Sequence, residues 1–114
     1  MAIPELEMAR VKKRLAAFCD RVPPHARDQD WYDWRVRGNQ VTVSEQRPAW
    51  RGQPGEITIH EFARFQYDPA THCWMLKWSD RNGRFHPYEG FEKVRSFDRL
   101  VDEVEADPTC IFFG

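Results

Sequence analysis

The segment from residue 31 to residue 88 contains a series of short stretches in which apolar and polar residues alternate. Alternation with a period of two is typical of β-strands that bury one face. Most turns between these stretches are too short for the crossover that joins parallel strands, so the segment is predicted to form an antiparallel meander of about five strands. The predicted strands lie within 31–47, on both sides of Gly38-Asn39, and over 57–67, 73–79 and 84–88.

Two stretches with helical periodicity flank the strands. The first is predicted over residues 5–22 and ends at Pro23-Pro24, since proline cannot continue a helix. The second is predicted over residues 97–106, with Ser96 as its N-cap. Their apolar stripes are Val11, Leu15, Phe18 and Val22 in the first helix, and Phe97, Leu100, Val101 and Val104 in the second.

An antiparallel meander with an N-terminal and a C-terminal helix packed on one of its faces is an α+β fold. The length of 114 residues suits a single domain over residues 1–114. The charged sides of both helices are expected to face water, namely Arg10, Lys13, Arg14 and Arg21 in the first and the acids Asp102, Glu103 and Glu105 in the second. The apolar tail 110–114 is expected to dock on the core or sheet, and Trp50, within the loop 47–56, to plug the edge of the core.

Cysteine usage and hydropathy restrict the class of protein. Cys19, Cys73 and Cys110 form no Cys-x-x-Cys pair, which argues against a disulfide framework or a zinc ribbon, and we expect them to be reduced and mostly buried. No apolar run is long enough to cross a membrane, and the N-terminus lacks the apolar stretch of a signal peptide, so the predicted location is the cytoplasm. The sequence predicts no metal and no cofactor.

The net charge of −1 hides an asymmetry, because residues 1–51 carry +3 and residues 52–114 carry −4. Proteins that coat nucleic acid usually have a clear basic excess. A nucleic-acid partner is therefore left open but is not favoured, and a homo-oligomer is equally left open.

The hairpin over residues 74–88 admits two registers at its turn. A two-residue Asn82-Gly83 turn would place Arg81 opposite Arg84, which is unfavourable for like charges. A three-residue loop with Gly83 in the left-handed bulge position instead places Asp80 opposite Arg84, as a pair of opposite charges. We favour the second register, in which Trp78 lies opposite His86.

This hairpin also carries a longer pattern of residues. Trp74, Leu76, Trp78, Asp80, Arg81, Gly83, Arg84, His86 and Tyr88 give W-x-L-x-W-x-D-R-x-G-R-x-H-x-Y, and the chain ends in D-P-T-x-x-F-x-G, from Asp107 to Gly114. With the upstream EQRPAW, this pattern resembles the small bacterial family catalogued as domain of unknown function 3024, over roughly residues 34–114. The resemblance implies no established activity and transfers no catalytic residue.

Three interpretations of the hairpin follow. In the first, Trp74, Leu76 and Trp78 are a core stripe against which His86 lies. In the second, the sheet presents a face whose arginine and aromatic side chains bind an anionic or protein partner, with Trp31, Trp34, Arg35 and Arg37 among them. The third interpretation is a metal-dependent hydrolase or nuclease, in which Asp68 or Asp80, together with Glu45 or Glu61, holds Mg²⁺ and His86 acts as general base. We favour a non-catalytic interaction domain, with these candidate binding residues: Arg64, Trp78, Asp80, Arg81, Arg84, His86 and Tyr88.

Overall fold

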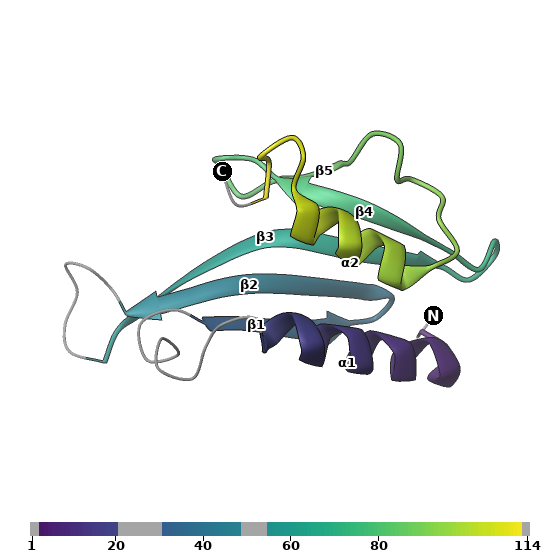
Figure 1. Cartoon of the computed structure of the whole chain (residues 1–114), viewed down its shortest axis with the longest axis horizontal. Coiled ribbons are helices and arrows are strands. Elements are labelled where there is room, and N and C mark those ends of the chain that lie inside the picture. Colours follow the sequence, from purple (N-terminus) through teal and green to yellow (C-terminus); the bar gives the residue numbers. More distant parts are fainter. Residues whose placement is uncertain (1–2, 21–30, 49–54, 113–114) are drawn as a thin grey trace.

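A computed structural model describes residues 3–20, 31–48 and 55–112 of the chain. It confirms the predicted α+β fold. The five strands form one antiparallel sheet in chain order, β1-β2-β3-β4-β5 (Figure 1). They are β1 (Trp31–Arg37), β2 (Gln40–Pro48), β3 (Ile57–Asp68), β4 (Cys73–Ser79) and β5 (Phe85–Pro87).

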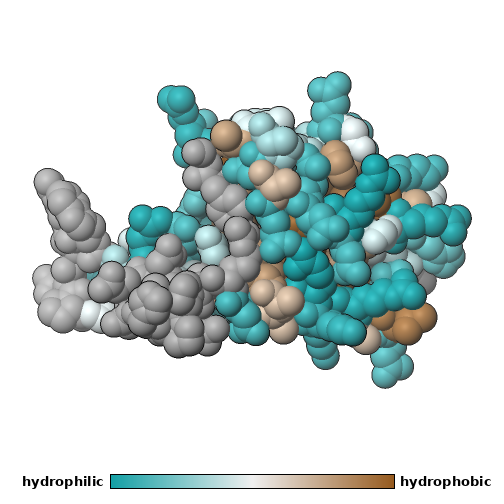
Figure 2. Space-filling model, viewed as in Figure 1, coloured by the Kyte–Doolittle hydropathy of each residue, from teal (hydrophilic) through white to brown (hydrophobic). Residues whose placement is uncertain are grey.

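The helices α1 (Glu5–Cys19) and α2 (Phe97–Ala106) pack side by side on one face of the sheet (Figure 1). In α1, the ring of Phe18 lies 5.1 Å from that of Tyr32 in β1. In α2, the ring of Phe97 lies 4.9 Å from both Phe65 in β3 and Trp74 in β4. The core is therefore the layer between the two helices and this face. The outward side of this helical layer is mostly hydrophilic (Figure 2).

The ends of the helices agree in part with the prediction. Ser96 caps α2, because its hydroxyl accepts a hydrogen bond from the Arg99 N–H at 3.4 Å. Asp107 ends α2 in a left-handed conformation. The first helix ends at Cys19, with Asp20 as its C-cap, rather than at the predicted Val22. Val22 itself and Trp50, predicted to plug the core edge, lie outside the described residues.

Arg14 corrects the prediction that the charged sides of both helices face water. Its guanidinium, half-buried between the helices, pairs with Asp102 at 2.9 Å and with Glu105. Glu103, another of the acids of α2 that were expected to face water, accepts a hydrogen bond from the Tyr88 hydroxyl at 2.8 Å. The prediction was wrong for Arg14, Glu103 and Glu105, which are half-buried, because helical periodicity does not reveal that the second helix lies alongside the first; Asp102 is exposed as predicted.

The C-terminal tail docks as expected, without forming a strand over residues 110–112. Phe112 is buried, and its N–H donates to the carboxylate of Asp107 at 3.1 Å. Cys73 is buried and Cys19 is half-buried, but the expectation of a buried Cys110 was wrong. The left-handed Asp107 starts a turn, closed by the Cys110 N–H donating to the Asp107 carbonyl at 3.0 Å, and that turn leaves Cys110 exposed.

A β-bulge divides β3 into two parts. Val43 pairs with Ala63, but the next residue of β2, Ser44, pairs with Glu61, so Phe62 is an extra residue in β3. Phe62 and Ala63 are both buried under the helices. N-terminal to the bulge the alternation is reversed, and Ile57 and Ile59 face away from the helices, with exposed fractions of 50% and 60%.

We refer to the sheet face opposite α1 and α2 as the open face. In the part of the chain that the structure describes, no helix covers it. Nor does any helix there have the length and apolar character needed to span a membrane.

Candidate functional site

The register of the β4–β5 hairpin is the predicted one. Trp78 pairs with His86, and the Asp80 N–H donates to the Arg84 carbonyl at 2.8 Å. The Gly83 N–H closes the turn on the Asp80 carbonyl at 3.0 Å, and Gly83 has a φ of +79°. The three-residue loop with a left-handed glycine is therefore confirmed.

The Asp80 carboxylate does not pair with the Arg84 guanidinium as predicted. It accepts hydrogen bonds from the backbone N–H groups of Asn82 at 2.8 Å and Arg84 at 3.0 Å. Its other oxygen lies 2.7 Å from Nε2 of His86, whose ring lies 4.8 Å from that of Trp78. The carboxylate thus bends over its own turn, where two backbone donors and an imidazole converge.

These contacts make the hairpin sensitive to acid. The hydrogen bond from His86, followed by that from the Arg84 N–H, holds the pKa of the Asp80 carboxyl below its ordinary value. A carboxyl with a depressed pKa in the folded state stabilises the fold above its unfolded pKa, and this contribution is lost as the pH falls through the folded pKa.

We expect Asp80→Asn to lower the melting temperature at pH 7, and the difference from the wild type to be smaller at about pH 2, where more of the Asp80 carboxyl is protonated and neutral like the amide. Thermal melts of both proteins over this pH range measure the effect. Glu89→Gln is the matched control, because Glu89 is exposed. An equal loss of stability at both pH values would contradict the assigned role of the Asp80 charge.

The predicted site residues lie on both faces of the sheet. Trp78 and His86 lie on the helix side, and Tyr88 is buried there. Arg64 lies on the open face, because it pairs with Lys77, the neighbour of Trp78, and successive side chains point to opposite faces. Arg81 and Arg84 are exposed at the turn. The predicted residues thus form two groups rather than one.

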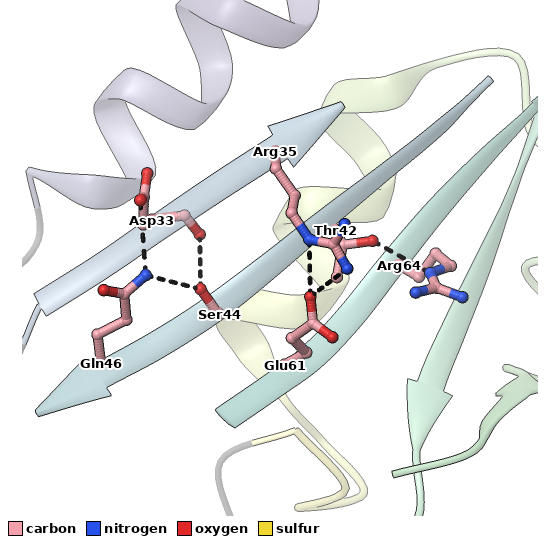
Figure 3. A network of polar contacts seen from close by, with 7 residues as sticks. All are labelled: Asp33, Arg35, Thr42, Ser44, Gln46, Glu61 and Arg64. Atoms are coloured by element: carbon pink, nitrogen blue, oxygen red, sulfur yellow. Dashed lines mark hydrogen bonds and ion pairs between the residues drawn. The ribbon is translucent and has the colours of Figure 1, made fainter. Parts of the chain in front are cut away.

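The open face is organised in rows that cross the strands. One row contains Asp33, Ser44 and Glu61, and the next contains Arg35, Thr42, Arg64 and Lys77. Figure 3 shows the contacts that connect these rows. Arg35 contacts Glu61 at 2.7 Å through NH2 and at 2.9 Å through Nε. We call Arg35, Thr42, Arg64 and Lys77 the cation row.

Arg64 is the central side chain of the cation row. Its Nε donates to the Thr42 hydroxyl at 3.1 Å, and its guanidinium carbon lies 4.1 Å from the centre of the Phe85 ring. Partial burial lowers the pKa of the Arg64 guanidinium from its ordinary value; Glu61 opposes this shift, and Arg35 adds to it. In the described part of the chain, no carboxylate forms an ion pair with Arg64 or with Lys77, which lies directly opposite it.

Beside the cation row the open face is hollowed to a volume of about 610 Å³. Arg35, Ser44 and Glu61 line its floor, and Asp80 and Arg81 of the hairpin turn line its wall. The hollow exists because β3 extends to Ile57, whereas β4 pairs with it only from Ala63 onward. Arg81 is thereby brought to the same surface as Arg35.

The carboxylates proposed for a metal-dependent hydrolase have other partners. Glu61 pairs with Arg35, Glu45 with Arg47, and Asp68 accepts from the Ala70 N–H and the Thr71 hydroxyl of its own turn. Within residues 3–20, 31–48 and 55–112, no three His, Cys, Asp or Glu side chains are grouped closely enough to hold a metal ion.

Comparison with known families identifies the chain. The family model of the domain of unknown function DUF3024 matches residues 3–114. The chain belongs to the DUF3024 family. No curated protein and no solved structure matches it. The motif from Trp74 to Tyr88 forms one hairpin in this DUF3024 chain. Its Trp74, Leu76 and Tyr88 are buried, and its Asp80, Arg81 and Arg84 lie at the turn.

Sequence reasoning missed most of the cation row. Thr42 and Lys77 were not among the candidate residues, and neither was Phe85, which packs on Arg64 beside the row; Arg35 was one of the arginines of the proposed binding face. Alternation places Arg35 and Lys77 on polar faces of their strands, but only the pairing of β1 with β2 and of β3 with β4 aligns them in one row. The sequence signal that could have aligned these residues is the strand register, derived from the lengths of the turns.

Proposed function

We propose that this DUF3024 chain is a non-catalytic interaction domain that binds an acidic segment of a partner protein along the cation row. The observation that carries the proposal is the cross-strand pair of Arg64 and Lys77. Two cations directly opposite each other in a sheet repel, and neither forms an ion pair within the described residues. A carboxylate placed between them would remove this repulsion.

The surroundings of Arg64 favour recognition of a carboxylate over simple solvation. Thr42 and the Phe85 ring hold its guanidinium in one orientation, so less conformational entropy is lost when an anion binds. Thr42 engages only Nε, which leaves the two terminal nitrogens available for a bidentate contact. A protein segment is favoured over nucleic acid because the whole chain has a net charge of −1.

Binding of a hexaglutamate peptide, measured by titration calorimetry at low salt, tests the proposal. We expect Arg64→Gln and Lys77→Gln each to weaken binding by about tenfold, because each removes a charge-assisted contact. Lys12→Gln is the control, since it makes the same change of charge at an exposed position of α1.

Equal weakening by Lys12→Gln would show that the peptide responds only to total charge, and the proposal would then be wrong. It would also be wrong if the wild type failed to bind the peptide. A single-stranded oligonucleotide that binds more tightly than the peptide, with a steep dependence on salt and loss in the same variants, would assign the row to nucleic acid instead.

A further inference from the structure

One edge of β3 has no strand partner in the described part of the chain. β4 pairs with β3 from Ala63 to Asp68, so the stretch from Ile57 to Phe62 lies beyond the end of β4. β2 occupies its other edge. Alternate residues of this stretch must direct their N–H and C=O groups away from β2, and these groups can pair with a further strand. We call the stretch 57–61, together with Glu56 directly before it, the free edge of β3.

The free edge lacks two of the devices that normally prevent edge-to-edge pairing, although Glu56 and Glu61 are charged and the bulge at Phe62 ends the stretch. It contains neither lysine nor proline, and it carries Ile57 and Ile59, two of the large hydrophobic residues that are exposed in the described part of the chain. A hydrophobic strand edge of this kind is a template for strand addition. The free edge borders the cation row, because Ile59, His60 and Glu61 line the same hollow as Arg35.

The sequence of the free edge is complementary to itself. When two copies pair in antiparallel orientation about Thr58, Ile57 of one copy lies opposite Ile59 of the other, and Thr58 lies opposite Thr58. Glu56 lies opposite His60, which is a pairing of an acid with a base. Apolar pairs, threonine pairs and pairs of opposite charge are the favourable cross-strand combinations.

The length of the free edge selects the same register. An antiparallel pair centred on Thr58 uses residues 56–60 of each copy, because Gly55 before them has a left-handed φ of +91°, and it stops before Ala63, where β4 takes over. A pair centred on Ile59 would instead oppose Ile57 with Glu61, which already binds Arg35. We propose that two copies of this chain associate through the free edges of β3, antiparallel and centred on Thr58.

The contact is short, so the affinity is expected to be modest. Interfaces below about 1,200 Å² are typical of weak or transient complexes, which corresponds here to a dissociation constant of about 1–100 μM. Sedimentation equilibrium of the whole chain over this range of concentration measures it. A protein that stays monomeric up to about 1 mM would overturn the proposal.

Ile59→Lys tests the surface, because a lysine on a strand edge opposes pairing. Ile59 is 60% exposed, so the monomer is expected to keep its melting temperature, whereas the dissociation constant should rise at least about tenfold. Leu6→Lys is the matched control, since Leu6 is 68% exposed but lies on α1. Dissociation by Leu6→Lys rather than Ile59→Lys would place the interface elsewhere and overturn the proposal.

An exchange of charges tests the register. Glu56→Lys and His60→Glu are each expected to weaken the dimer, because each places like or unmatched groups opposite each other across the twofold axis. The double variant restores an opposite-charge pair and should recover the dimer to within about twofold of the wild type. If the losses of dimer affinity in the two single variants simply add in the double variant, a pairing centred on Thr58 is ruled out.

Discussion

Replacement of Trp74 by alanine is expected to lower the free energy of unfolding by about 3–5 kcal/mol, the range for the loss of a large buried aromatic side chain. Trp74 is only 1% exposed, and its ring lies 5.1 Å from that of Tyr67 and 4.9 Å from that of Phe97. It therefore joins the sheet to α2. Equilibrium unfolding in urea, followed by circular dichroism, measures the change.

Trp78→Ala is the matched comparison within the same strand. Trp78 is half-buried and lies against His86 at the edge of the core, so its loss should cost less than that of Trp74. An equal or larger cost for Trp78 would contradict the order of burial. The comparison also tests whether β4 is a core stripe or part of a binding face, since Trp74 belongs to the core and only Trp78 borders the surface.

Gly83→Val is the second substitution with a large expected effect. Gly83 has a φ of +79°, and a β-branched residue there is expected to cost about 1–3 kcal/mol of backbone strain. No heavy atom lies within 4 Å of the position that a Cβ would occupy, so the loss would arise from the backbone rather than from crowding. Urea unfolding of the variant and of the wild type measures the cost.

Gly83→Asn provides the control, because asparagine adopts the left-handed region more readily than valine. The free energy of unfolding that Gly83→Asn loses should be less than half of the free energy that Gly83→Val loses. Equal losses for the two variants would show that something other than backbone conformation determines the role of Gly83.

The sheet and the hairpin register were predictable because they depend on local chemistry. Alternation located the strands, and the repulsion expected between Arg81 and Arg84 selected the three-residue turn that the structure contains. The partner of the Asp80 carboxylate was not predictable in the same way. A short carboxylate at a turn can reach nearby backbone N–H groups more easily than a long flexible side chain.

The bulge at Phe62 explains most of what the sequence concealed about the open face. Unbroken alternation along β3 would place Ile57 and Ile59 on the same face as Phe65, under the helices. The extra residue reverses the faces, exposes both isoleucines and aligns Glu61 with Arg35. No turn or composition signal marks such an insertion within a strand, so the open face could be defined only from the structure.

The chain order of the strands bears on how the domain folds. Each strand pairs with its neighbour in sequence, so the described sheet can grow hairpin by hairpin through contacts between nearby residues. The pairing of Arg14 with Asp102 joins positions 88 residues apart and forms only when the two helices meet. We therefore expect helix docking to be a late step, so that weakening the contacts between α1 and α2 speeds unfolding more than it slows folding.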